Sequence, residues 1–195
     1  MAKKLMILGH PDIEQSLANN MIYSIVKENL QDIEIRNLAE LYPDYKIDVL
    51  AEQQALIKAD IVIFQFPFFW YGVPAILKKY FDDVYTYQFA YGSEGDKLHG
   101  KKMQLSFTTG AGETDYTPIG IENYRLPEFL KPLEQLAYYT GMDYVEPVFT
   151  QSMMYIPDIM GVKEDVVSKA QTHASRLIEK VSQLEQSHFQ GISNL

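Results

Sequence analysis

The sequence contains no cysteine among its 195 residues. Disulfide bonds, thiolate metal sites and a cysteine nucleophile are therefore excluded, while the cellular compartment is left open. Histidine is also scarce, and His99, His173 and His188 do not show the spacing of metal ligands, so we expect no metal site. The serines do not fall in a G-x-S-x-G pattern, which argues against a serine hydrolase.

Positive charge and long apolar runs are lacking as well. Seventeen basic residues face 26 acidic ones, and no cluster of lysine or arginine interrupts the net charge of −9. Nucleic acid is therefore not an expected partner. No run approaches the roughly 20 apolar residues of a membrane span, and the apolar run at 5–8 is too short for the core of a signal peptide. We expect a cytoplasmic protein with no direct membrane insertion.

Strand and helix patterns alternate along the chain. Strands are expected at 5–8, 33–35, 61–66, 102–108 and 144–149, and helices at 17–30, 49–58, 73–84, 127–139 and 163–184. This alternation predicts an α/β fold with helices on both faces of a parallel sheet. The spacing fits a flavodoxin-like, three-layer arrangement with five strands in the order 2-1-3-4-5. We predict one domain over residues 1–185 and a polar tail at 186–195.

In that order the first, third and fourth strands are neighbours, so the loops that follow them line one crevice. The first loop offers His10 and a helix start, with the residues Ser16, Leu17, Ala18 and Asn19. The free N–H groups and positive dipole of a helix start suit a phosphate group. Each residue alone also has a simpler interpretation, because Ser16 can be only a helix cap and His10 only a loop residue.

The other two loops are aromatic and glycine-rich. The second holds the only tryptophan, in the run Pro67, Phe68, Phe69, Trp70 and Tyr71, and the third holds Thr108, Thr109, Gly110, Ala111 and Gly112. Alone, such runs are typical of core packing and of ordinary turns. Together with the phosphate-ready helix start, they predict a pocket for a flavin or another nucleotide. A flavin supplies hydride chemistry itself, so the protein need only hold and orient it.

Three motifs carry a family resemblance. Residues 66–78, the opening from Gly9 to Asn19, and residues 105–110 resemble the NAD(P)H quinone oxidoreductase family. Residues 41–44 and 98–101 are most similar to its short bacterial members, which include the ancillary flavoproteins of glutathione-regulated potassium efflux systems. The resemblance implies that the loop residues named above are flavin contacts, and that the protein forms homodimers with sites at the interface.

The resemblance also implies roles for three further residues. Tyr116 falls where family members place a catalytic tyrosine beside the nicotinamide or quinone substrate, and Tyr91 where a substrate contact reaches the partner subunit's site. Family members often carry a catalytic histidine a few residues beyond the first of these tyrosines, whereas this chain has Glu122. A carboxyl group can donate a hydrogen bond to developing charge only when it is protonated, which requires a raised pKa.

The expected function is a flavoenzyme that takes hydride from NADH or NADPH and passes two electrons to a quinone-like acceptor by ping-pong kinetics. FMN is the favoured cofactor and FAD the alternative, because FAD-binding relatives carry additional carboxyl-terminal structure. One alternative function is a redox-regulatory ancillary subunit of a potassium efflux transporter in the membrane. Another is a flavodoxin-like electron carrier.

Overall fold

Five parallel strands form a single sheet in the order β2-β1-β3-β4-β5, as predicted. The computed structural model describes residues 2–192. The strands are β1 (Lys4–Leu8), β2 (Ile33–Asn37), β3 (Ile61–Pro67), β4 (Lys102–Thr108) and β5 (Asp143–Thr150). The order reverses direction between β1 and β3, which is where open α/β sheets bind ligands.

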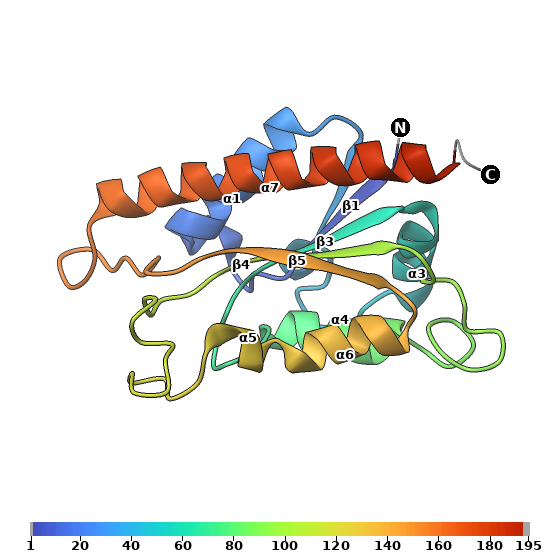
Figure 1. Cartoon of the computed structure of the whole chain (residues 1–195), viewed down its shortest axis with the longest axis horizontal. Coiled ribbons are helices and arrows are strands. Elements are labelled where there is room, and N and C mark those ends of the chain that lie inside the picture. The colour runs from blue at the N-terminus through green and yellow to red at the C-terminus, as the bar shows by residue number, and fades with distance from the viewer. Residues whose placement is uncertain (1, 193–195) are drawn as a thin grey trace.

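Helices cover both faces of the sheet (Figure 1). In chain order they are η1 (Ile13–Gln15), α1 (Leu17–Asn29), α2 (Leu38–Leu41), α3 (Val49–Lys58), α4 (Ala75–Val84), α5 (Leu126–Phe129), α6 (Lys131–Tyr139) and α7 (Lys163–Ile192). The apolar sides of α1 and α7 pack on one face, and those of α3, α4, α5 and α6 pack on the other. The result is the three-layer fold expected from the sequence.

The central strand β3 is buried along its whole length. Side chains alternate between the faces of a strand, so Phe64 and Phe66 enter the core beneath α4, while Ile61 and Ile63 pack toward α1 and α7. Because helices cover both faces of the sheet, nearly every residue of β3 is apolar, and the strand is a continuous apolar run in the sequence. Gln65 is the polar exception within it, and its side chain is fully buried.

Two helix predictions were wrong in detail. The helix expected at 127–139 is two short helices, α5 and α6, that meet at Leu130. Each has a proline in its first turn, where a missing N–H is tolerated, so each proline marks a separate helix start. The last helix, α7, runs to Ile192 rather than 184, because glutamine and glutamate beyond that point favour a helix. The predicted tail at 186–195 therefore begins inside α7, and its last three residues lie outside the described part.

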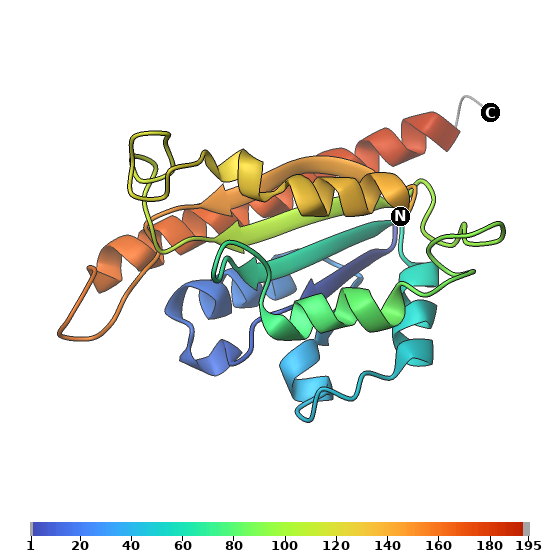
Figure 2. The ribbon, with the colours of Figure 1, turned by 90° about the horizontal axis from the view of Figure 1, so that it is seen from below.

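The loops that leave β1, β3, β4 and β5 gather at one end of the sheet (Figure 2). The sheet therefore brings together segments that are more than 140 residues apart, from His10 to Tyr155, along one edge of a cavity. Within residues 2–192, no helix is long and apolar enough to cross a membrane.

Candidate active site

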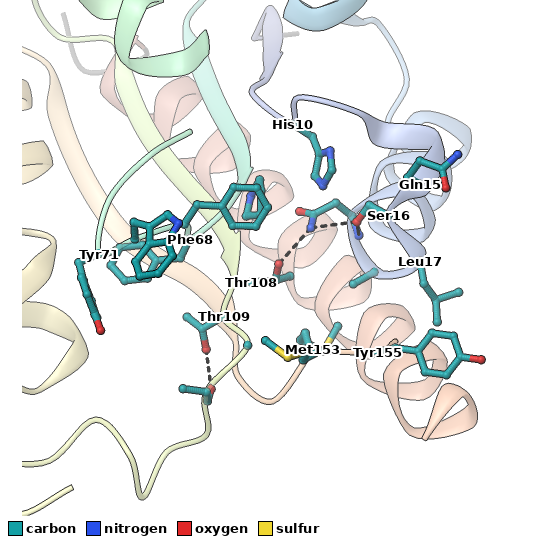
Figure 3. Close-up of a pocket in the computed structure, with 18 of the residues that line it drawn as sticks. His10, Gln15, Ser16, Leu17, Phe68, Tyr71, Thr108, Thr109, Met153 and Tyr155 are labelled. Atoms are coloured by element: carbon teal, nitrogen blue, oxygen red, sulfur yellow. Dashed lines mark hydrogen bonds between the residues drawn. The ribbon is translucent and has the colours of Figure 1, made fainter. Parts of the chain in front are cut away.

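A cavity of about 540 Å³ opens between these loops (Figure 3). It is lined by His10, Gln15, Ser16, Leu17, Ala18, Asn19, Pro67, Phe68, Phe69, Trp70, Tyr71, Thr108, Thr109, Gly110, Ala111, Tyr116, Glu122, Met153, Met154 and Tyr155. The structure thus places in one cavity every predicted flavin contact except Gly112, together with both predicted catalytic residues. The second predicted substrate residue, Tyr91, lies elsewhere.

The start of α1 forms one end of the cavity. Ser16 caps the helix, because its Oγ accepts a hydrogen bond of 3.1 Å from the N–H of Asn19. The N–H groups of Leu17 and Ala18 bond to no acceptor in the described part of the chain. Two free N–H groups at the positive end of a 13-residue helix favour an anionic ligand.

His10 presents a hydrogen-bond donor to the same region. Its Nδ1 accepts a bond of 3.0 Å from the N–H of Asp12, so the proton of the neutral ring is on Nε2. Burial lowers the pKa of His10, against an opposing effect of Asp12, and the ring is therefore mainly neutral at pH 7. The ring of Phe69 lies edge-on to it, with centroids 6.1 Å apart. His10 can therefore contribute one N–H to a ligand without adding charge.

The aromatic loop divides into a core residue and an exposed turn. Phe68 is buried against Phe107, whereas the side chain of Trp70 is 92% exposed. Trp70 and Tyr71 have left-handed backbone conformations, with φ of 46° and 65°, and the N–H of Gly72 closes the turn on the carbonyl of Phe69. Such conformations are strained for residues other than glycine and occur often at ligand sites. The turn leaves the N–H groups of Trp70 and Tyr71 without a protein acceptor among the described residues.

The loop after β4 offers fewer free N–H groups than its sequence suggests. The N–H of Thr109 bonds to the carbonyl of Thr150 at 3.0 Å, and the N–H of Gly112 bonds to the carboxylate of Asp115 at 2.7 Å. The N–H groups of Gly110 and Ala111 bond to no acceptor within residues 2–192 and remain as the two donors that the turn can offer to a ligand. The backbone of Ala111 is not in the left-handed region, so this turn does not require glycine there.

Tyr116 and Glu122 also line the cavity. The ring of Tyr116 packs edge-on against Phe68 and Phe129, with centroids 6.5 and 6.0 Å apart. Burial, followed by the charge of Glu122, raises the pKa of Tyr116 to about 12, so its hydroxyl stays protonated at neutral pH and can donate. The same carboxylate raises the pKa of Tyr71. Glu122 Oε2 is buried without a hydrogen-bond partner in the described part of the protein, and it can accept a bond from a ligand.

Tyr91 lies in a second, mainly apolar cavity of about 520 Å³ between α4 and α6. Its ring packs against Tyr87 and Tyr139. Of the residues that line this second cavity, Tyr71 also lines the first. The structure therefore does not bring Tyr91 to the candidate active site of its own chain.

Four residues that line the cavity were not predicted from the sequence: Gln15 of η1, and Met153, Met154 and Tyr155 of the loop after β5. The strand order offered a signal for the last three, because β5 lies beside β4 and its loop leaves the sheet at the same end. Met154 closes over the glycine turn, since a Cβ on Gly110 would come within 2.7 Å of its terminal methyl group.

Known proteins match the chain over most of its length. The model of a family described as having a flavodoxin-like fold matches residues 2–176. The Bacillus subtilis protein YrkL, named as an uncharacterized NAD(P)H oxidoreductase, is 42% identical over 76% of this chain and 84% of its own. The glutathione-regulated potassium-efflux system ancillary protein KefF of Klebsiella aerogenes is 38% identical over 90% of this chain and 94% of its own.

A solved structure is also similar. The general stress protein 14 of Treponema denticola, determined in complex with FMN, superposes with a TM-score of 0.80 and 33% identity, covering 90% of this chain and 97% of that protein. Sequence motifs, strand order and these relatives agree. The chain belongs to the flavodoxin-like family, among relatives that include an NAD(P)H oxidoreductase and KefF.

Proposed function

We propose that this protein is an FMN-dependent NAD(P)H oxidoreductase that delivers two electrons to quinone-like acceptors. One observation carries the proposal: a single cavity joins the anion-binding start of α1 to the aromatic turn at Trp70 and Tyr71. A phosphate group at one end and a planar ring at the other are the two parts of a flavin mononucleotide. The FMN bound by the Treponema denticola relative supports this choice over FAD.

The residues of the cavity have separate tasks in this proposal. The phosphate group of FMN would be held by Ser16, Leu17 and Ala18. The aromatic turn at Trp70 and Tyr71 would pack beside the flavin ring. When bound, FMN supplies the hydride chemistry between a reduced pyridine nucleotide and the acceptor. The free N–H groups of Gly110 and Ala111 would donate to negative charge on the ligand.

Tyr116 and Glu122 act as a pair. The Tyr116 hydroxyl, whose pKa is raised by burial and then by the charge of Glu122, would donate to a substrate beside the ring. The unpartnered Oε2 of Glu122 would accept a bond from a donor on the ligand. Glu122 thus differs from the family histidine in the direction of its hydrogen bond, because it accepts where a histidine can donate.

Anaerobic stopped-flow absorption spectroscopy tests the proposal. Purified protein loaded with FMN is mixed with NADH or with NADPH, and the flavin absorption is followed before a quinone is added. We expect bleaching by at least one nucleotide and recovery with the quinone, and parallel lines in double-reciprocal steady-state plots, as ping-pong kinetics require. Failure of both nucleotides to bleach the flavin would overturn the proposal and favour an electron carrier. The mass of the flavin released on denaturation separates FMN from FAD.

A homodimer is part of the proposal. The second cavity presents Tyr91, Tyr139 and the outer side of Tyr71 on the surface next to the flavin site. A second copy placed there would bring its own Tyr91 toward this site. Sedimentation velocity of the wild type and of Tyr91→Lys provides the test, with a dimer expected for the former and weakened association for the latter. A monomeric wild type at micromolar concentration would exclude this arrangement.

The similarity to KefF favours a second candidate function, that of a regulatory subunit of a potassium efflux transporter. The two functions are compatible, because a redox enzyme can also bind a membrane protein. Co-purification with a candidate efflux transporter in detergent, with and without bound FMN, tests it. Retention that depends on the flavin would support redox regulation, and no retention in either state would exclude it.

A further inference from the structure

A line of hydrogen-bonded polar side chains, all but Thr150 buried, runs from α7 to the candidate flavin cavity, on the face of the sheet covered by α1 and α7. In order, its members are Thr150, His173, Ser106, Gln65, Asn19 and Thr108. Gln65, Ser106 and His173 are fully buried, and the last two members line the cavity. Polar groups at such depth destabilise a protein unless they are hydrogen-bonded to one another.

Each side chain of the line contacts the next at hydrogen-bond distance. On the α7 side, Thr150 Oγ1 lies 2.9 Å from His173 Nδ1, and Ser106 Oγ lies 2.8 Å from His173 Nε2. Ser106 Oγ then donates to Gln65 Oε1 at 2.5 Å. The chain of bonds therefore reaches the central strand without a gap.

On the cavity side, the bonds run in the same direction. Gln65 Nε2 donates to Asn19 Oδ1 at 2.8 Å. Asn19 Nδ2 donates to Thr108 Oγ1 at 3.0 Å and to Ser16 Oγ at 3.3 Å (Figure 3). Two hydroxyl groups at the cavity wall are thus the last acceptors of the line.

The hydrogen bonds of Ser106 determine the tautomer of His173. A serine hydroxyl has one hydrogen, and that of Ser106 is directed to Gln65, so the bond between Ser106 and His173 must be donated by Nε2–H. Nδ1 is then the acceptor of the Thr150 hydroxyl. Burial, followed by the charge of Arg176, lowers the pKa of His173 to about 3, which agrees with a neutral ring.

The direction of the hydrogen bonds in the line determines whether the cavity presents hydroxyl donors or acceptors to a ligand. The Thr108 and Ser16 hydroxyls both accept from Asn19, so their own hydrogens are left to donate into the cavity. If the line ran the other way, His173 would carry its proton on Nδ1 and the two hydroxyls would donate to Asn19. They would then present only lone pairs beside the start of α1, and would repel an anion there.

We propose that His173 is a positioning residue for the anionic end of the ligand. Its Nε2–H tautomer orients the line so that Ser16 and Thr108 present hydroxyl hydrogens to a phosphate group at the start of α1. The inference rests on the proposed binding of FMN, and it adds a residue on the far side of the sheet to the determinants of phosphate recognition.

The first experiment measures flavin affinity by quenching of flavin fluorescence, with FMN and with riboflavin, which lacks the phosphate. His173→Phe removes the donor, whereas His173→Gln keeps an N–H near the position of Nε2. We expect the phenylalanine variant to bind FMN about tenfold more weakly and riboflavin unchanged, and the glutamine variant to stay within about threefold of wild type for both. Equal loss of both ligands, or no loss of FMN, would overturn the inference.

Thr140→Val is the matched control, because it removes a buried hydroxyl whose hydrogen bonds to described residues are to the carbonyls of Leu136 and Ala137 in α6, away from the line. We expect it to leave both affinities unchanged. Urea unfolding of each variant shows that the comparison is made between folded proteins.

The second experiment needs no ligand. Imidazole ¹⁵N resonances of the wild type distinguish the two tautomers from the charged ring, and comparison with His173→Gln assigns the signal. We expect a neutral Nε2–H ring at pH 7. An Nδ1–H or a charged ring would overturn the inference even if FMN binds. Conversely, a wild type that binds no flavin would overturn the proposed function, while the tautomer would still decide the direction of the line.

Discussion

The two faces of the sheet are built from the same strands but differ in chemistry. Toward α4, α5 and α6, the strands present Phe64, Phe66 and Phe107, which belong to one apolar core. Toward α1 and α7, the neighbouring positions are Gln65 and Ser106, which belong to the hydrogen-bonded line that ends at the cavity. Alternation along a strand thus places a residue of the apolar core next to a residue of the polar line, for which we propose a role in ligand recognition. Four changes test this division.

The largest effect is expected from Phe107→Ala on the apolar face. Phe107 is fully buried and stacks on Phe66 and Phe149, with both centroid distances at 5.4 Å. Loss of a buried phenylalanine typically lowers the free energy of unfolding by about 3–5 kcal/mol, because a cavity replaces the ring. Urea unfolding measures it, with Ile119→Ser, at a 99% exposed position, as a control expected within about 0.5 kcal/mol of wild type. A loss below about 1 kcal/mol would show that this face is not the stabilising one.

Gln65→Leu on the opposite face should have a smaller effect. The substitution keeps the approximate size of the side chain but removes the acceptor of the Ser106 hydroxyl hydrogen and the donor to Asn19 Oδ1. We expect a loss of about 2 kcal/mol in the free energy of unfolding and weaker FMN binding. Urea unfolding and fluorescence titration measure the two effects. A more stable variant with unchanged FMN affinity would mean that the polar line contributes neither to stability nor to FMN binding.

Acid should act on the polar face through His173. Burial lowers the pKa of His173 to about 3 in the folded protein, against 6.5 for a free side chain, so between these two pH values the unfolded chain binds the proton more strongly than the folded protein does. Stability conferred by the neutral ring is therefore complete above pH 6.5 and falls by up to about 1.4 kcal/mol per pH unit as the pH drops toward 3. Urea unfolding from pH 7 to pH 4 should show a shallower decline for His173→Gln. Parallel curves for variant and wild type would contradict a buried neutral ring.

Ser16→Ala should have the smallest effect on stability. It removes the cap of α1, which typically lowers the free energy of unfolding by about 1 kcal/mol. The same hydroxyl ends the polar line, so FMN affinity should fall while riboflavin affinity does not. Ser16→Thr keeps a hydroxyl and is the control for both measurements. A loss of stability without any change in FMN affinity would show that Ser16 caps α1 but does not contribute to FMN binding.

Strong local patterns explain which elements could be predicted. The helix Val49–Lys58 and the strand Lys102–Thr108 were predicted with correct bounds, because a buried face gave each a clear period. The break at Leu130 was missed because the apolar spacing continues across it. The strand order followed from the alternation of elements, and with it the position of three ligand loops at one end of the sheet.

The parts of the site that escaped prediction depend on partners distant in sequence. Met153 and Met154 carry no chemical signal, and only the packing of β5 on β4 brings them to the cavity. The N–H of Thr109 is occupied by Thr150, so the glycine turn has fewer donors than its sequence suggests. His173 was considered only as a metal ligand and was set aside because it lacked the spacing of one. Its role in the polar line could not be predicted, because its partner Ser106 lies 67 residues away in the sequence.

The left-handed turn at Trp70 and Tyr71 lowers the stability of the free chain. Glycine or asparagine would relieve the backbone strain at Trp70, and the exposed indole contributes little packing to the free chain. Stability alone would therefore favour a smaller residue at this position, whereas the proposed flavin site uses the aromatic ring. The two demands on this position are opposed, and the residue present meets the demand of the proposed site.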